Sequence, residues 1–134
     1  MCPVDCSVLL VEDDADTEQL ILRALRRAGV SEILVARDGQ EALDTLAAVR
    51  RQPHLMLLDA KLPTLDGYEV LRRLRMLPSE EALSIVVFSS EDSPAAVTRA
   101  LSLGATEYAV KPTSSEDLTL TIEQMVHRYA PMAA

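Results

Sequence analysis

Five short apolar runs alternate along the chain with five segments that carry apolar residues at helical spacing. The runs predict β-strands at residues 7–11, 33–36, 55–58, 84–88 and 108–110. The third run is unbroken, which is typical of a strand buried on both faces. Asp59 follows this run directly. The pattern therefore places a carboxylate at the end of the strand that we expect to be the most buried.

The intervals between the strands show the three- and four-residue spacing of amphipathic helices. Ser93 followed by Pro94 is typical of a helix N-terminus, and residues 114–117 (SSED) resemble a capping box. Strict alternation of strand and helix predicts an α/β fold, with a doubly wound parallel sheet that carries helices on both faces.

The length of the chain fits a single domain. Its 134 residues are enough for one core, and a hydrophobic content of 49% argues against disorder. We expect one domain over residues 1–134, with a folded core at about residues 6–130 and a short tail after it. No segment that would form an output domain is visible.

Composition also narrows the classes of function. A formal net charge of -8 argues against nucleic-acid binding, which needs a basic face. No apolar run approaches the length of about 20 residues that spans a membrane, and no signal peptide is visible, so we expect a cytoplasmic protein. Cys2 and Cys6 are expected to be incidental reduced cysteines, and His54 and His127 to be structural or surface residues.

Polar side chains follow four of the predicted strands where each strand ends. They are Glu12, Asp13 and Asp14 after the first strand, Asp59 after the third, Ser89 and Ser90 after the fourth, and Lys111 after the fifth. In a doubly wound sheet, ligands bind beyond the carboxyl ends of the strands. Any one of these residues fits a solvated loop, and Asp14 and Asp16 fit a cap or the dipole of the first helix. Four strands that all end in this way favour a shared site.

The residue types at this edge point to phosphoryl chemistry. Two carboxylates about 4 Å apart repel by about 4 kcal/mol at an effective dielectric constant of about 20, so a crowded pair needs a proton or a cation. Mg²⁺ suits carboxylate and phosphate oxygens, and no His/Cys set competes for zinc. The chain has eleven arginines but only two lysines, Lys61 and Lys111, and both flank this edge. Carboxylates loaded with Mg²⁺, opposite a lysine and a hydroxyl, predict a phosphoryl site with an aspartate as nucleophile.

The sequence resembles the receiver domain of two-component response regulators, which has the chemotaxis-type (CheY-like), flavodoxin-like fold. The motifs that carry the resemblance are LLVEDD (9–14), LLDAKLPTLDG (57–67), IVVFSS (85–90) and YAVKP (108–112). They occur in the order and spacing of the family and cover nearly the whole chain. The resemblance implies a five-stranded sheet in the order 2-1-3-4-5. It also implies a signalling protein that catalyses only its own phosphorylation and dephosphorylation.

The resemblance assigns the acidic residues to phosphorylation and metal binding. Asp59 would accept the phosphoryl group from the phosphohistidine of a sensor histidine kinase. Mg²⁺ would be held by Glu12, Asp13, Asp59 and the backbone carbonyl of Lys61. The motifs leave open the roles of Asp14 and of the Lys61 side chain.

The resemblance also assigns a switch. Ser89 would be the switch hydroxyl, Tyr108 the aromatic residue that changes rotamer with it, and Lys111 the contact to the phosphoryl group. The Lys111–Pro112 peptide bond would be cis, as proline allows. The output would be a changed surface on the fourth helix, the fifth strand and the fifth helix, for docking to a partner or for a homodimer.

Less specific segments of the sequence favour one subgroup of receiver domains. Residues 38–43 (DGQEAL), residues 88–92 (FSSED) and the missing output domain are similar to the stand-alone receivers that partner bacterial phytochrome kinases. Single receivers of the chemotaxis and sporulation-relay types are alternatives. A receiver of the sporulation-relay type would be a phosphorelay intermediate, which passes phosphoryl groups on to another protein or removes them from the pathway.

Three competing classes are less well supported. A Mg²⁺-dependent aspartyl phosphatase of the haloacid-dehalogenase type would resemble Asp-x-Asp, but Lys61 stands at the second acidic position. A flavodoxin-like electron carrier would need a loop rich in glycine and hydroxyls, which residues 11–19 (VEDDADTEQ) lack. A non-phosphorylated interaction module would not need the complete set of acids, serine and lysine that this chain carries.

Overall fold

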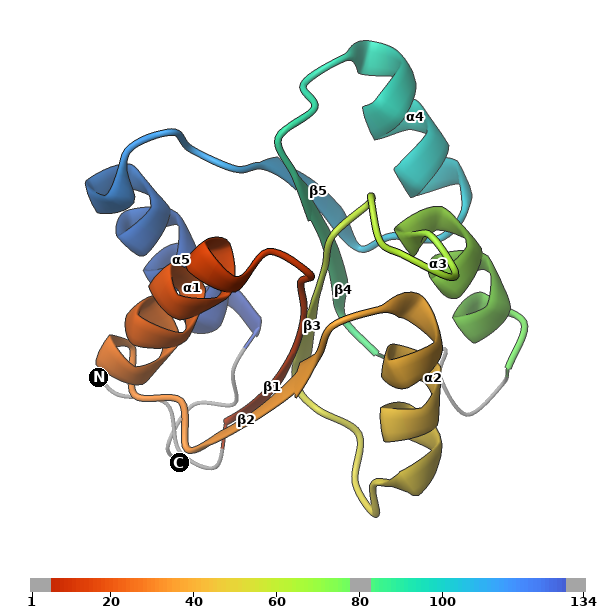
Figure 1. The fold of residues 1–134 in the computed structure, drawn as a ribbon, viewed down its shortest axis with the longest axis horizontal. Coiled ribbons are helices and arrows are strands. Elements are labelled where there is room, and N and C mark those ends of the chain that lie inside the picture. The colour runs from red at the N-terminus through yellow and green to blue at the C-terminus, as the bar shows by residue number, and fades with distance from the viewer. Residues whose placement is uncertain (1–5, 78–82, 130–134) are drawn as a thin grey trace.

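The computed structural model describes residues 6–77 and 83–129, which form one five-stranded parallel sheet between two layers of helices (Figure 1). The strands are β1 (Ser7–Val11), β2 (Glu32–Ala36), β3 (Leu55–Leu58), β4 (Ile85–Ser89) and β5 (Glu107–Val110). The helices are α1 (Ala15–Arg27), α2 (Gly39–Ala48), α3 (Gly67–Arg75), α4 (Pro94–Ser102) and α5 (Ser115–Tyr129). The strand order β2-β1-β3-β4-β5 confirms the predicted doubly wound α/β fold.

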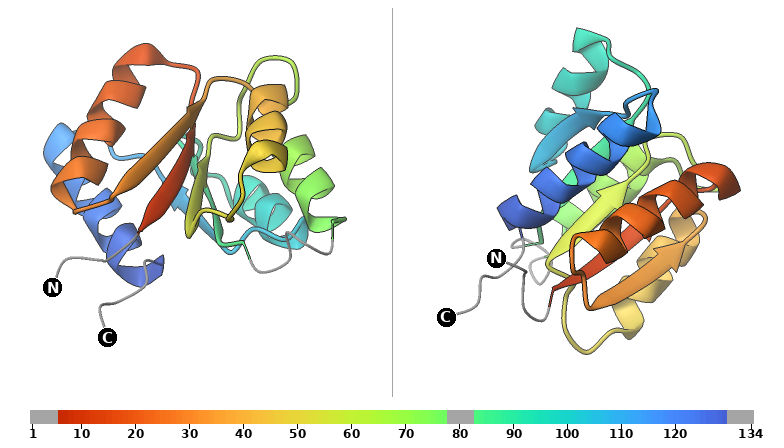
Figure 2. Two further views of the ribbon diagram at one scale, coloured as in Figure 1. Left: turned by 90° about the horizontal axis from the view of Figure 1, so that it is seen from below. Right: turned by 90° about the vertical axis from the view of Figure 1, so that its left-hand side faces the viewer.

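The five helices divide unequally between the two faces of the sheet. α1 and α5 pack side by side on one face, whereas α2, α3 and α4 cover the other (Figures 1 and 2). Each layer encloses its own core. Leu10, Phe88 and Ile122 lie in the core beneath α1 and α5, and Leu58 and Leu71 lie in the core beneath the other three helices.

β3 lies at the centre of the sheet and is fully buried, as its unbroken apolar run predicts. Its four residues are at most 1% exposed. Leu55 and Leu57 belong to the core under α1 and α5, while Met56 and Leu58 belong to the opposite core. Because both faces of the strand are covered, the backbone that leads into Asp59 is rigidly packed.

The caps of the last two helices follow the sequence signals. At α4, the Ser93 side chain accepts a hydrogen bond from the Ala96 N–H at 3.2 Å, and Pro94 occupies the first helical position. At α5, the Ser114 hydroxyl accepts from the Asp117 N–H at 3.1 Å. The first backbone N–H groups of a helix have no partner within the helix, and these bonds satisfy one of them in each case. The caps therefore fix the residue at which each loop ends and the helix begins.

The described residues include Cys6 and both histidines but not Cys2. Cys6 has a free thiol buried in the core, and Cys2 and the tail at residues 130–134 lie outside the described residues. His54 accepts a hydrogen bond from the Ser7 N–H at its Nδ1 atom, 3.1 Å away. His127 is exposed on α5. The two histidines are therefore structural and surface residues, as expected.

Candidate functional site

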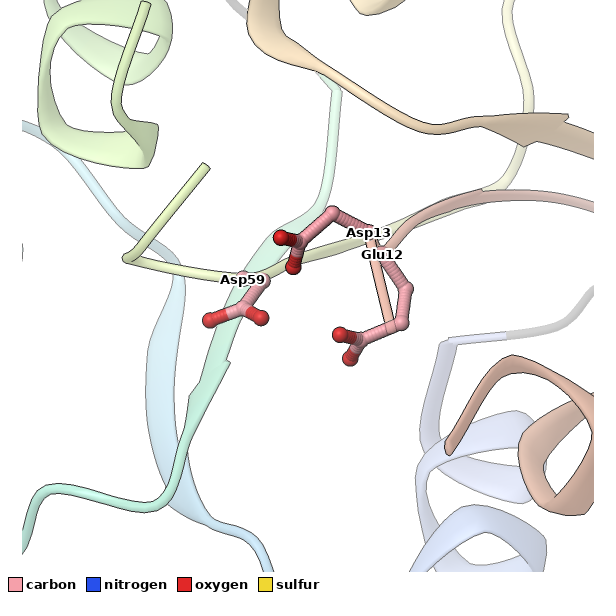
Figure 3. Close-up of side chains that lie close together, drawn as sticks. All are labelled: Glu12, Asp13 and Asp59. Carbon is pink, nitrogen blue, oxygen red and sulfur yellow. The ribbon is translucent and has the colours of Figure 1, made fainter. Parts of the chain in front are cut away.

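Glu12, Asp13 and Asp59 form an acidic cluster at the carboxyl ends of β1 and β3 (Figure 3). Each residue offers one carboxylate oxygen, and these oxygens lie within 4.8 Å of one another. The backbone of the sheet holds two of the three residues. The Glu12 N–H donates to the Ala36 carbonyl at 3.0 Å, and the Asp59 N–H donates to the Val11 carbonyl at 3.1 Å. Glu12 is 2% exposed and Asp59 is 9% exposed, whereas Asp13 is open to solvent.

Lys111 joins the cluster from the end of β5. Its Nζ atom lies 2.6 Å from Glu12 Oε1 and 3.1 Å from Asp59 Oδ2. Burial alone would lower the pKa of Lys111, but the hydrogen bond to Glu12 and the charge of Asp59 outweigh burial and raise this pKa above its ordinary value. Lys111 is therefore a cation that partly neutralises the acids around it.

Glu12 carries the strongest electrostatic perturbation in the site. Burial raises its pKa from 4.5 to about 7, and the charge of Asp59 acts in the same direction, against the hydrogen bond from Lys111. Three carboxylates facing one ammonium leave an excess of negative charge, so the site is completed by a proton or by a cation. An all-oxygen donor set fits a hard divalent cation.

Ser89 and Tyr108 lie on neighbouring strands beside the cluster. Ser89 is the last residue of β4 and is 2% exposed, and its hydroxyl accepts a hydrogen bond from the Glu91 N–H at 3.2 Å. The Tyr108 hydroxyl donates a short hydrogen bond to the carbonyl of Glu91. Both predicted switch residues therefore contact the loop between β4 and α4. Sequence reasoning missed Glu91, because its backbone and not its side chain makes these contacts.

A cavity of about 470 Å³ lies over the cluster and collects the predicted residues. Its lining includes Glu12, Asp13, Asp59, Lys61, Ser89, Ser90, Lys111 and Pro112. Tyr108 is absent from this lining and lies on β5, where it pairs with Val87 of β4. The tips of β1, β3, β4 and β5 thus converge on one pocket, which is the arrangement expected from the sequence.

Asp14, the third acid after β1, has a structural role. Its Oδ2 atom accepts hydrogen bonds from the Thr17 N–H at 2.9 Å and from the Thr17 hydroxyl at 2.6 Å, and these bonds lower the pKa of Asp14. Asp14 is the N-cap of α1, and Asp16 lies in the first turn of that helix. The interpretation of both residues as helix-end acids is confirmed.

The expected cis peptide bond between Lys111 and Pro112 is wrong. Every peptide bond between described residues is trans. The trans form of an X–Pro bond is favoured intrinsically by about 0.5–1 kcal/mol. With this bond trans, the Lys111 ammonium still reaches Glu12 and Asp59, so the cluster does not require the cis isomer.

Sequence reasoning also missed a contact between α3 and α4. The guanidinium carbon of Arg99 lies 4.0 Å from the centroid of the Tyr68 ring, in cation–π geometry. A second cavity, of about 500 Å³, borders this pair and shares Asp13 and Lys61 with the first. Tyr68 and Arg99 stand on different helices, so no local spacing in the sequence could have paired them.

The fold and the site together define a receiver domain of the response regulator class. The chain belongs to the response regulator receiver domain family, which it matches over residues 8–123. It is 38% identical over 123 residues to the probable methanogenesis regulatory protein FilR2 of Methanothrix harundinacea, an alignment that covers 88% of this chain and 79% of FilR2. The response regulator MprA of Mycolicibacterium vanbaalenii is 36% identical, but the chain spans only about half (52%) of its length.

Two solved structures extend the comparison to three dimensions. The phosphorylated cyanobacterial phytochrome response regulator RcpA has a TM-score of 0.87 and 27% identity, with 94% of both chains covered. The response regulator RPA3017, from red light signalling in R. palustris, has a TM-score of 0.84 and 28% identity, with 96% of both chains covered. Within the described residues, no helix of this chain has the length and apolar character needed to cross a membrane.

Proposed function

We propose that this protein is the phosphoacceptor of a two-component system and that Asp59 takes a phosphoryl group from the phosphohistidine of a sensor histidine kinase. The observation that supports this function is the position of Asp59 in one cavity with Glu12, Asp13 and Lys111. In the transfer, an Asp59 oxygen forms a bond to phosphorus, the phosphorus–nitrogen bond breaks, and the imidazole keeps the electron pair. Because β3 holds Asp59 with little freedom, the attacking oxygen is already oriented.

The proposed cofactor is Mg²⁺, held by Glu12, Asp13, Asp59 and the backbone carbonyl of Lys61. When bound, the ion neutralises charge on the phosphoryl oxygens during transfer. Lys111 offers three N–H donors on a flexible stem, and these donors move from the carboxylates to the phosphoryl oxygens. The chain catalyses its own phosphorylation and dephosphorylation and acts on no separate substrate.

Phosphorylation would be read out through Ser89 and Tyr108. A phosphoryl group adds a charge of about −1.5 to −2 and new acceptor oxygens. Ser89 turns to donate to one of these oxygens and leaves Glu91, and Tyr108 then moves into the space beside it. The altered surface comprises α4, β5 and α5, where Leu101 and Val110 are 49% and 42% exposed. This surface is the proposed site of partner docking or homodimer formation.

We further propose a bacteriophytochrome as the sensor kinase, with both proteins in the cytoplasm. Support comes from the whole-length similarity to RcpA and RPA3017, which are response regulators of phytochrome and red light signalling. Phosphotransfer from a purified bacteriophytochrome kinase should outpace transfer from other sensor kinases of the same cell. Equal or slower transfer from the bacteriophytochrome would contradict this assignment.

Intact-mass measurement tests the phosphoacceptor directly. The wild-type protein should gain one phosphoryl group from acetyl phosphate with Mg²⁺, and D59N should gain none. D44N is the matched control, because Asp44 is an exposed aspartate on the face of α2 that points away from the sheet. If D59N gained the group at the wild-type rate, Asp59 would not be the phosphoacceptor.

Sedimentation velocity tests the output surface. The protein is measured with and without Mg²⁺ and beryllofluoride, which stands in for the phosphoryl group. A shift toward a dimer that V110D abolishes would support the homodimer. A monomer unchanged by beryllofluoride would leave docking to a different partner as the output.

A further inference from the structure

Asp13 differs from the other two acids of the cluster in how it is held. Its side chain is exposed and makes no hydrogen bond or salt bridge with any described residue. Its carboxylate nevertheless points toward Asp59, and the two offer oxygens within 4.8 Å of one another (Figure 3). The backbone on either side of Asp13 must therefore set the position of this side chain.

That backbone is anchored on both sides at the end of β2. Before Asp13, the Glu12 N–H donates to the Ala36 carbonyl at 3.0 Å. After Asp13, Glu18 of α1 forms a salt bridge with Arg37, the residue that follows Ala36 in the sequence. The two anchors thus end on consecutive residues, and the first of these, Ala36, is fully buried. The segment that carries Asp13 is therefore held at both ends to one fixed part of the sheet.

The contact between Glu18 and Arg37 is bidentate. Arg37 Nε lies 3.0 Å from Glu18 Oε1, and Arg37 Nη2 donates to Glu18 Oε2 at 3.1 Å. Such a paired contact fixes the relative orientation of the two groups, which a single contact does not. The Glu18 N–H also donates to the Asp14 carbonyl at 2.9 Å. The first turn of α1 therefore transmits this orientation to the residue next to Asp13.

The two partners of this salt bridge differ in burial. The Glu18 side chain is 6% exposed, whereas the Arg37 side chain is 62% exposed. A buried carboxylate is unfavourable unless a cation or several donors satisfy it, so Glu18 depends on its contact with Arg37. Loss of Arg37 should therefore also displace Glu18.

We propose that Glu18 and Arg37 are positioning residues, whose salt bridge holds Asp13 within reach of the Mg²⁺ ion. The inference rests on the proposed role of Mg²⁺ as cofactor. Neither residue lines the cavity over the acidic cluster, so neither contacts the ion itself. Without the salt bridge, the segment between residues 12 and 18 is anchored at one end only. Mg²⁺ binding then weakens although every ligand is still present.

The sign of the effect separates positioning from simple electrostatics. Removing a nearby cation strengthens the attraction of an acidic site for Mg²⁺, so an electrostatic effect of R37M would be tighter binding. Loss of positioning predicts weaker binding in the same variant. R37K keeps the charge but lacks the fork that makes two parallel contacts, so electrostatics predicts no change in this variant and positioning predicts a partial loss.

Mg²⁺ affinity is measured by calorimetry at one pH and ionic strength, at a temperature where every variant is folded. Removing a direct partner of a metal ligand costs about 10- to 100-fold in affinity, and this salt bridge acts one step further away, so R37M should bind about three- to tenfold more weakly than wild type. R37K should lie between the two. R128M is the matched control, because it breaks an exposed salt bridge to Glu107 at the start of β5, and its affinity should equal that of wild type.

The double variant E18Q/R37M separates positioning from stability. R37M leaves the buried Glu18 carboxylate without its partner, which should lower the melting temperature. E18Q/R37M removes that unpaired charge and should recover part of the melting temperature. Its Mg²⁺ affinity should nevertheless stay as low as that of R37M. An affinity that recovered together with the melting temperature would overturn the inference, because the salt bridge would then support the fold alone.

Amide NMR tests the same contact without any metal. In the metal-free protein, the order parameters of the Asp13 and Asp14 N–H groups should be lower in R37M than in wild type and R128M. Unchanged order parameters would overturn the inference, as would an R37M protein that binds Mg²⁺ as tightly as wild type or more tightly. A wild-type protein that bound no Mg²⁺ would instead overturn the proposed cofactor, and this inference with it.

Discussion

Ser89 and Tyr108 bind the same residue from two strands: the Ser89 hydroxyl accepts from the Glu91 N–H, and the Tyr108 hydroxyl donates to the Glu91 carbonyl. The β4–α4 loop is thus held by both residues at one point. A movement of Ser89 toward a phosphoryl group removes one of the two bonds. The remaining bond joins this loop to the Tyr108 ring, which is partly buried against the core under α2, α3 and α4.

The first prediction follows from that bond. Y108F keeps the ring but loses the hydrogen bond to Glu91, which is worth about 0.5–1.5 kcal/mol. The β4–α4 loop should therefore leave its position at residue 108 about two- to tenfold more often in the unphosphorylated protein. Amide NMR should show the Ser89 and Glu91 signals shifted from their wild-type positions.

Y129F is the control for this experiment. The Tyr129 hydroxyl contacts Glu107 at the other end of β5, away from the β4–α4 loop. Its loss should leave the Ser89 and Glu91 signals unchanged. The coupling through Glu91 would be wrong if these signals were also unchanged in Y108F.

The second prediction concerns Glu12 and pH. The pKa of Glu12 is about 7 in the folded protein against an ordinary value of 4.5, so the folded state binds the proton more tightly than the unfolded state. This protonation stabilises the metal-free fold fully below pH of about 4.5, and the contribution is lost as pH rises through about 7. A metal needs the deprotonated carboxylate, so the apparent Mg²⁺ affinity should rise by up to about tenfold per pH unit below pH 7 and then level off.

Calorimetry or amide NMR can follow this binding, since the chain has no tryptophan for fluorescence. E12Q removes the titrating group and keeps a side chain that can pair with Lys111. Its Mg²⁺ affinity should be weaker than that of wild type and nearly flat between pH 6 and 8. A wild-type affinity that is equally flat would show that Glu12 does not take part in metal binding.

The third prediction concerns the charge balance of the cluster. Lys111 is the cation in contact with buried Glu12 and with Asp59, so K111M leaves these acids facing one another without a cation in contact with them. Removing one member of a buried pair costs about 3–5 kcal/mol, and we expect a loss in this range for the metal-free protein at pH 8. Mg²⁺ should restore part of the stability, and it should raise the melting temperature of K111M more than that of wild type.

R128M is the matched control for Lys111. It breaks the exposed salt bridge between Arg128 and Glu107, which should contribute about 0–1 kcal/mol. Its response to Mg²⁺ should equal that of wild type. If K111M were as stable as R128M without Mg²⁺, the acids would not be held together by the lysine.

The elements of the fold could be predicted because each core-facing segment carries an unbroken or periodic apolar run. The errors lie at strand ends, where polar residues take part in the backbone ladder without an apolar signal. Ser89 was expected just after β4, yet it is the last residue of that strand and pairs with Val110 of β5. Glu32 and Glu107 extend the starts of β2 and β5 in the same way.

The candidate site could be predicted as a group, because the carboxyl ends of parallel strands share one edge of the sheet. Individual side-chain pairings between other elements could not be predicted. Glu18 on α1 is 5% exposed and pairs with Arg37 after β2, at 3.0 Å. The stack of Arg99 on Tyr68 is a second case. No spacing rule within one helix or strand links such residues, since their proximity arises only when the layers pack.

The last prediction concerns Gly67, at the start of α3. A Cβ atom built on Gly67 would lie 2.1 Å from the Asp59 carbonyl oxygen and 2.8 Å from the Ala60 Cα, and both are backbone atoms that cannot turn away. G67A must therefore push α3 away from the residue that carries the candidate phosphoacceptor. We expect a loss of about 1–3 kcal/mol in stability, which is typical of an overpacked site, together with slower phosphorylation of Asp59.

G39A separates these two effects. Its Cβ would lie equally close, 2.1 Å, to a backbone carbonyl, but that carbonyl belongs to Leu65 and not to Asp59. Both variants should unfold at lower denaturant concentration than wild type, whereas only G67A should slow phosphorylation by acetyl phosphate under conditions where each variant is fully folded. Equal rates in G67A and wild type would mean that the close approach of α3 supports the fold and leaves the orientation of Asp59 untouched.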